Sequence, residues 1–297
     1  MLKMKSALCI VAIFSLALVS CVEHLPEKEM PNVDNGAITM VQAAVKPLTI
    51  EGLTGTGAYK WDGNRTLGIY GTSGGVNECY LPVKSTAGSS ESYFYGNVVA
   101  GDLTIYMPYS LEGGERALDG RVVVPEKQQF YADPFDHLMY NSTFLATTST
   151  NVVEFDYHAG LVKILVKYDV EEIVSVRVLV GNLNSGYSEY IAGELSVVDG
   201  LLDESHNPSA KVSIENFGKG IGSSVDNPLT VWAAVAPGIY ENFVIEITDS
   251  NNVTISAPVE GPFEVSRCAV AAKDCVAQKI DHNNGTDDFV GEGGTYN

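Results

Sequence analysis

The chain has 297 residues, of which 45% are hydrophobic and 19% are charged, so it is long enough to bury one or two cores. Acidic residues outnumber basic residues by 37 to 18, which gives a formal net charge of −19 at pH 7. A surface this acidic repels phosphate backbones and anionic lipid headgroups, so nucleic-acid binding is not expected.

The first 21 residues predict export. Lys3 and Lys5 make the start basic, and an uncharged apolar run follows from Ala7 to Val19. This run is shorter than the about 20 residues that a membrane-spanning helix needs, so it fits a signal sequence. Leu18-Val-Ser-Cys21 is typical of the bacterial lipobox, in which the signal is removed and the cysteine is diacylated. We predict a lipoprotein signal peptide over 1–20 and lipidation of Cys21; the alternative is an ordinary signal with a chance cysteine.

The segment after the lipobox predicts a tether. Removal of 20 residues, with their two lysines, leaves a mature chain of 277 residues with a formal charge of −21. Residues 21–36 contain two prolines and many polar groups, which favours a tether between the lipid and the first domain. Acidic residues just after a lipidated cysteine also help to send some lipoproteins of Gram-negative anaerobes to the cell surface.

Beyond residue 37 the hydrophobic pattern has a period of two, which is typical of half-buried strands. The predicted core-facing residues are Val162, Ile164, Val166, Tyr168, Val174, Val176, Val178, Val180, Phe243, Ile245 and Ile247. Turn pairs such as Asp199-Gly200 separate the runs. No segment predicts an amphipathic helix convincingly; 269–279 is ambiguous, and we favour a strand there. The pattern predicts an all-β chain of antiparallel sandwiches.

The strand runs divide the mature chain into two predicted domains. An N-terminal β-sandwich domain is predicted over 37–149 and a C-terminal one over 150–281, with a polar seam at 147–151. The polar, glycine-rich residues 282–297 predict a flexible tail.

The motifs of enzymes and cofactor sites give no support for catalysis. The five histidines (His24, His137, His158, His206 and His282) lie in no recognisable nucleophile or metal pattern, so we expect no enzyme activity, cofactor or metal. Asp133 and Asp136 are interpreted as a turn before a strand rather than as an acid pair. Gly218-Lys-Gly-Ile-Gly-Ser-Ser224 lacks the order of a phosphate loop and is interpreted as a hairpin loop.

Cysteines and tyrosines leave alternatives open. Cys268 and Cys275 either pair across a hairpin or are small buried side chains, and Cys79 leaves an odd count. Fifteen tyrosines offer amphipathic surface for protein or sugar recognition, or pack at strand rims.

Several stretches, in one order, resemble the fimbrillin-like proteins, the type V pilus subunits and related surface lipoproteins of Bacteroides-type bacteria. The matching stretches are Trp61-Asp-Gly-Asn-Arg-Thr-Leu-Gly-Ile-Tyr70, Leu103-Thr-Ile-Tyr-Met-Pro-Tyr109, Pro134-Phe-Asp-His-Leu-Met-Tyr140, Val153–Ile164 and Val235-Ala-Pro-Gly-Ile-Tyr240 with Val244–Asp249. Two departures are Asn141 in place of a small residue and a His158 motif that is one residue out of step.

The resemblance implies two tandem transthyretin-like β-sandwiches and a polymerisation mechanism. In the family, a protease removes the N-terminal segment with its first strand, and a strand from the next subunit fills the groove. Well-known members are cut after arginine, but this chain has no arginine between Cys21 and Asn64, and Lys46 precedes Pro47. Either another protease cuts, or the subunit stays lipid-held. Over 38–45 either parity of side chains could fill the groove.

The expected function is therefore a structural subunit or accessory component of a type V pilus, assembled by donor-strand exchange and contributing to adhesion. The alternative is a stand-alone lipid-anchored adhesin or glycan-binding protein. Expected partners are pilin subunits, the outer membrane through the lipid on Cys21, and a host or bacterial surface ligand. The expected location is the surface of the outer membrane, or a fimbrium after processing.

Overall fold

The computed structural model describes residues 37–45, 48–49, 56–57, 60–72, 75–181, 186–271, 274–281 and 287–291. All of them belong to one compact unit, 33–297. The predicted signal peptide, the lipidation site Cys21 and the tether lie outside the described residues. Within the described ranges, no helix has the length and apolar character needed to cross a bilayer.

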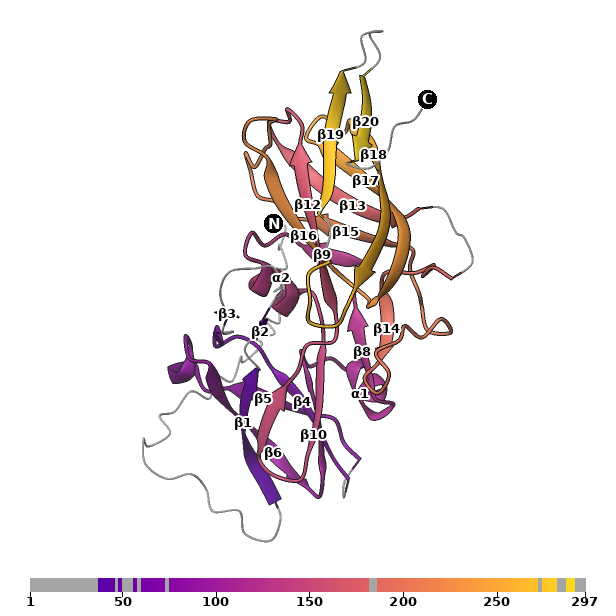
Figure 1. Cartoon of the computed structure of the whole chain (residues 1–297). Helices are drawn as coiled ribbons and strands as arrows, with labels where there is room; N and C mark the ends of the chain where they lie inside the picture. Colours follow the sequence, from indigo (N-terminus) through magenta and orange to yellow (C-terminus); the bar gives the residue numbers. More distant parts are fainter. Residues whose placement is uncertain are drawn as a thin grey trace, which may run out of the picture. The chain divides into compact units, whose positions relative to one another are not determined.

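The prediction of an all-β chain is confirmed, because strands dominate the described residues (Figure 1). The strands are β1 Ala37–Val45, β2 Leu48–Thr49, β3 Thr56–Gly57, β4 Leu67–Gly71, β5 Glu78–Pro82, β6 Glu91–Ala100, β7 Leu103–Met107, β8 Arg121–Val124, β9 Lys127–Gln129, β10 Phe144–Thr148, β11 Val152–Phe155, β12 Gly160–Lys167, β13 Ile173–Val180, β14 Gly193–Ser196, β15 Lys211–Glu215, β16 Leu229–Val235, β17 Gly238–Asp249, β18 Thr254–Val265, β19 Cys275–Asp281 and β20 Asp287–Gly291. The helices are α1 Gly113–Leu118, α2 Pro134–Tyr140 and a 3₁₀ turn, Lys84–Thr86.

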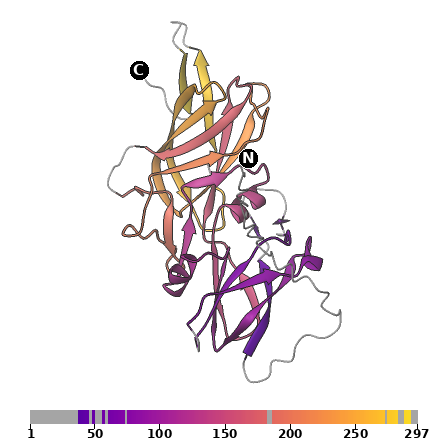
Figure 2. The same cartoon turned by 180° about the vertical axis from the view of Figure 1, so that it is seen from behind.

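Three larger sheets contain most strands. A seven-stranded sheet has the order β10-β7-β4-β5-β6-β1-β11. A four-stranded sheet has the order β16-β12-β19-β20, and a five-stranded sheet has the order β18-β17-β13-β15-β9. The last two sheets contact each other through β18 with β20 and through β15 with β16, and Figure 2 shows them from behind.

Most of the alternation predicted from sequence is observed. In β12 and β17 the predicted inward residues Val162, Ile164, Phe243 and Ile245 have no exposed surface. In β13, Val176 and Val178 are buried, but Val174 is 47% exposed. The pairing with β17 shifts register between Ile173 and Ser175, and such a bulge turns the preceding side chains to the other face.

The interpretation of Asp133 and Asp136 as a turn before a strand is wrong. Asp133 is the N-cap of α2, and its carboxylate accepts hydrogen bonds from the backbone N–H groups of Phe135 and Asp136 (2.8 and 3.1 Å). Pro134 stands at the first helical position, where its missing N–H costs nothing.

Strand pairs cross the predicted boundary between 149 and 150, which itself stays a prediction. β11 follows the boundary but pairs with β1, whereas β8 and β9 precede it and pair with β14 and β15. At the C-terminal end, part of the predicted flexible tail forms β20, antiparallel to β19. The prediction overlooked Phe289 and Val290, two residues of types that favour strands.

Candidate functional site

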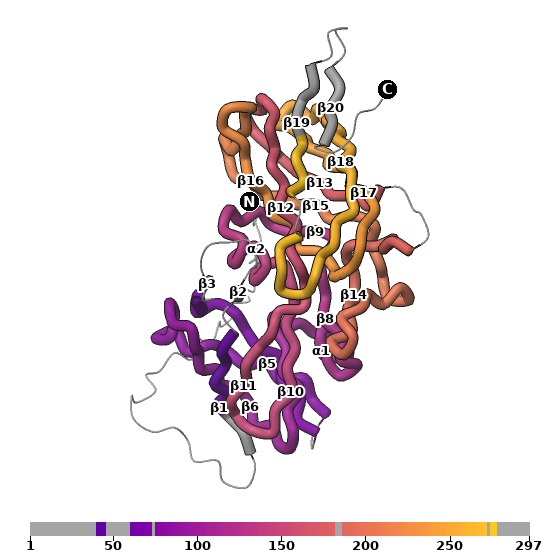
Figure 3. Tube along the Cα trace, in the orientation of Figure 1, coloured from indigo at the N-terminus to yellow at the C-terminus, as the bar shows by residue number. Residues whose placement is uncertain are grey.

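β1, the first strand that the structure describes, lies inside the seven-stranded sheet between β6 and β11 (Figure 3). Seven of its residues pair antiparallel with β6, and its last four pair parallel with β11. The backbone N–H of Gln42 also donates to the carbonyl of Asn151 (2.8 Å). A strand held on both sides leaves a strand-wide slot when it is taken out, and β1 is therefore the candidate functional site.

The structure decides which parity of β1 faces the core. Val41 and Ala43 have no exposed surface and Val45 is 5% exposed, whereas Gln42 and Ala44 are half-buried. On the outer face, Gln42 Nε2 donates to Glu91 Oε2 (2.7 Å). The groove-filling residues that the sequence left open are thus the odd-numbered ones from Val41 to Val45.

The inward side chains of β1 are small, and two of them lie opposite large side chains; the third, Ala43, lies opposite Ser92 and Val153. Val41 lies opposite Phe94 in β6 and Val45 opposite Phe155 in β11, and both phenylalanines are fully buried. The Trp61 ring meets Phe94 edge-on, with 5.1 Å between the centroids. Burial of each valine of β1 contributes about 1.5–3 kcal/mol to stability. Removal of β1 would lose this contribution and would also expose the rings of Phe94 and Phe155 to water.

The basic residues after β1 differ in how well a protease could reach them. Lys60 is exposed, and the next residue, Trp61, is 1% exposed and bonded through its backbone N–H to the carbonyl of Ser89 (2.9 Å). Arg65, the first arginine after Cys21, places its guanidinium 4.3 Å from the centre of the Tyr140 ring. A cut after Lys60 would separate β1 and leave Trp61 in the core, whereas a cut after Arg65 would release Trp61 too.

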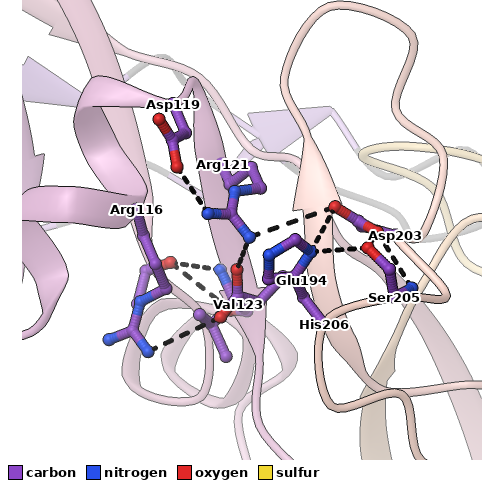
Figure 4. A network of polar contacts seen from close by, with 9 residues as sticks. Arg116, Asp119, Arg121, Val123, Glu194, Asp203, Ser205 and His206 are labelled. Carbon is purple, nitrogen blue, oxygen red and sulfur yellow. Dashed lines mark hydrogen bonds and ion pairs between the residues drawn. The ribbon is translucent and has the colours of Figure 1, made fainter.

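A cluster of charged residues joins β8 to β14 (Figure 4). Arg121, whose side chain is 12% exposed, binds the carboxylates of Glu194 (2.5 Å) and Asp119 (2.6 Å) and lies 4.0 Å from Asp203. Arg116 adds a longer contact to Glu194 (3.9 Å). Because the Glu194 carboxylate is only 10% exposed, it depends on the Arg121 guanidinium of the neighbouring strand for charge compensation.

Three residues at the margin of this cluster combine the side chains of a hydrolase triad without its geometry. Ser205 Oγ and Asp203 Oδ2 both lie near the same ring nitrogen of His206, Nδ1, at 2.8 and 2.7 Å. A triad needs the nucleophile and the carboxylate on opposite nitrogens, so this arrangement is a polar turn. Hydrogen bonds from Ser205 lower the pKa of Asp203 below its ordinary value, with a smaller effect from His206.

The remaining histidines are buried or lie outside the described residues. Burial lowers the pKa of His137 to about 3 and the pKa of His158 to about 4, so both rings are neutral at pH 7. His24 and His282 lie outside the described residues. Across the described ranges, no group of three or more His, Cys, Asp or Glu residues could hold a metal ion.

The open questions on Cys268 and on the glycine-rich loop have structural answers. Cys268 carries a free thiol that donates to the carbonyl of Tyr157 (3.0 Å), so no bond joins it to Cys275. Burial raises the pKa of this thiol to about 11, which makes it a poor nucleophile.

The loop at Gly218 is not a hairpin loop, because it connects β15 to β16 in the other sheet; Gly218 and Gly220 have φ of 81° and 77°.

One structurally central polar residue was not singled out from the sequence. The side chain of Gln128 in β9 is almost fully buried and bonds to both backbone groups of Ala234 in β16: Nε2 donates to the carbonyl (2.6 Å), and Oε1 accepts from the N–H (3.0 Å). Nε2 also donates to the carbonyl of Pro125 (3.1 Å), and Oε1 lies 2.9 Å from His137 Nε2. No local sequence signal identifies Gln128, because its main partner is more than a hundred positions away.

No known protein-family profile and no curated protein sequence matches the chain. Among solved structures, a proposed cell adhesion protein from Bacteroides ovatus is similar, with a TM-score of 0.47 and 15% identity over 85% of this chain and 94% of that one. A proposed cell adhesion protein from Bacteroides fragilis has a TM-score of 0.42 and 11% identity, covering 86% and 98%. The tip fimbrial protein Mfa3 from Porphyromonas gingivalis has a TM-score of 0.32 and 8% identity, covering 84% and 96%.

Proposed function

We propose that this chain is a structural subunit or accessory component of a fimbrillin-like, type V pilus, and that it assembles by exchange of β1. The observation that carries the proposal is the placement of β1: it is the first described strand, it pairs on both sides, and its core-facing side chains are small. A donated strand with alternating small apolar residues would restore the same backbone bonds and fill the same pockets.

Export, lipidation and cleavage precede strand exchange in the proposed pathway. The chain is exported, is lipidated on Cys21 and is held at the outer surface of the outer membrane. A protease that cuts after Lys60 then frees β1 while Trp61 stays in the core. The two predicted domains, 37–149 and 150–281, are tandem transthyretin-like sandwiches, and the other partners are neighbouring pilin subunits. In this proposal the protein has no enzymatic role.

The test starts from purified mature protein. Digestion with a lysine-specific protease should release an N-terminal fragment ending at Lys60, and the remainder should form ladders that resist mild detergent. The Lys60→Gln variant should stay monomeric under the same digestion, and Lys127→Gln, which changes an exposed lysine of β9, should behave like the wild type. Clean cleavage after Lys60 with persistent monomers would contradict strand exchange.

A second candidate function is a stand-alone, lipid-anchored adhesin or glycan-binding protein. The observation that favours it is a set of partly exposed tyrosines on the outer face of the seven-stranded sheet. An uncut protein that never polymerises but binds a surface ligand would support this candidate.

A further inference from the structure

The outer face of the seven-stranded sheet gathers aromatic and apolar side chains in adjacent rows. Tyr95 in β6 lies opposite Leu81 in β5 on one side and opposite Met40 in β1 on the other. Residues directly opposite each other in antiparallel strands share a face, so these three side chains form one row. The strand register alone therefore places these three side chains on one face of the sheet.

A second row runs beside the first. Tyr93 in β6 lies opposite Gln42 in β1, and Gln42 lies opposite Val152 in β11. Tyr93 and Tyr95 are two positions apart on one strand, so their Cα atoms are separated by about 6.5–7 Å on the same face. The two rows make up the tyrosine face, which consists of Met40, Leu81, Tyr93, Tyr95, Gln42 and Val152.

The tyrosine face is accessible. Leu81 is 46% exposed and Val152 is 54% exposed, and the two tyrosines and Gln42 are half-buried. Half-buried tyrosines in a sheet have restricted rotamers, and this limits the conformational entropy that they lose when a ligand stacks on them.

The charge around the tyrosine face and the size of this face limit the kinds of ligand that it could bind. The chain is strongly acidic, and the tyrosine face itself has no charged member. The next row on the same side of the sheet places the exposed Glu91 and Glu154 on either side of Ala44, and Gln42 Nε2 donates to Glu91 Oε2 (2.7 Å). These bordering carboxylates disfavour an anionic ligand and offer acceptors for the hydroxyls of a neutral one. A stable protein partner buries roughly 20–30 residues on each side, far more than these six side chains provide. A saccharide offers C–H faces for the tyrosine rings and hydroxyls for the amide of Gln42.

We propose that the tyrosine face binds a neutral, linear saccharide along β6, with Tyr93 and Tyr95 as stacking platforms and Gln42 as a hydrogen-bonding side chain. Two of its six residues belong to β1, so the face described here requires β1 in place. The site is therefore a property of the uncut chain and does not depend on polymerisation.

The experiment uses full-length mature protein carrying Lys60→Gln, so that β1 is retained. Binding is measured by calorimetry against neutral linear hexasaccharides of glucose, mannose, xylose and N-acetyllactosamine, with a heparin hexasaccharide as the charged control. At least one neutral probe should bind, and Tyr93→Ala and Tyr95→Ala should each weaken it by about tenfold or more. Tyr95→Trp, which keeps an aromatic platform, should bind within a few-fold of the parent, and Tyr190→Ala, outside the sheet, should not change binding.

Several results would overturn the proposal. These are no binding to any neutral probe, equal binding to heparin, or unchanged affinity in both alanine variants with the fold intact by circular dichroism. A protein that dimerises in sedimentation runs and becomes monomeric on Leu81→Ser would assign the face to a second copy instead. Loss of detergent-resistant ladders in the digestion experiment would leave this result unaffected, so the two proposals fail separately.

Discussion

Replacing Gln128 by alanine should destabilise the protein more than almost any other single polar change. The side chain is 2% exposed and serves four groups: the N–H and carbonyl of Ala234, the carbonyl of Pro125 and the ring of His137. Each buried group left without a partner costs about 1–3 kcal/mol, and water entering the cavity would recover part of this. We therefore expect Gln128→Ala to lower the free energy of unfolding by about 4 kcal/mol.

The assay is urea unfolding monitored by tryptophan fluorescence, since Trp232 lies in β16 itself and bonds to the carbonyl of Ala132. A loss of about 4 kcal/mol corresponds to a fall of roughly 8–16 °C in melting temperature for a chain of this size. The matched control is Gln129→Ala, because Gln129 is the exposed neighbour in the same strand. Equal effects of the two substitutions, or a loss below about 1 kcal/mol for Gln128→Ala, would refute the reasoning.

Three further predictions concern other parts of the chain. Val41→Asp should lower the free energy of unfolding by about 3 kcal/mol or more, because a carboxylate would enter the core, whereas Met40→Asp on the outer face should cost far less in the same urea titration. The pKa values of His137 and His158 are lowered on folding, so the unfolded chain takes up these protons first and stability falls as the pH drops below about 6.5. At about pH 4.5 His137 alone accounts for roughly 3 kcal/mol of the loss and His158 adds to it, so His137→Gln should show a smaller fall between these two pH values. Arg121→Met should cost about 3 kcal/mol by leaving Glu194 buried without its main cation, and an unchanged melting temperature would show that the cluster is dispensable.

The local hydrophobic pattern predicted the strands well. It predicted poorly the side chains and short elements that connect strands distant in the sequence. A period of two identified β12 and β17 because each has one buried face, and the same rule failed at Val174, where a bulge changes the parity. β1 was ambiguous because small or apolar residues occupy both parities. Gln42 was the one discriminating signal, since a glutamine seldom faces a core without partners.

The α2 helix was not predicted, although the sequence contains a typical start signal for a helix there. Asp133 followed by Pro134 is a typical N-cap and first helical position, but α2 is only seven residues long, too short to show a helical period. For the candidate site, the family resemblance implied an exchangeable first strand, while its inward parity and the position of Lys60 beside buried Trp61 depend on the three-dimensional fold. The reach of Gln128 to Ala234 depends on a tertiary contact that no local pattern encodes.

The parallel pairing of β1 with β11 has a consequence for how the chain becomes structured during synthesis. Gln42 can pair with Val152 only after more than half of the polypeptide has been made. One side of β1 therefore stays unpaired until β11 has been synthesised. Closing such a distant contact is entropically costly and slow compared with hairpin formation. Within the seven-stranded sheet, β1 is thus the last strand to gain both of its partners, which leaves an interval in which chaperones, proteases or the exposed edge of another chain can compete for it.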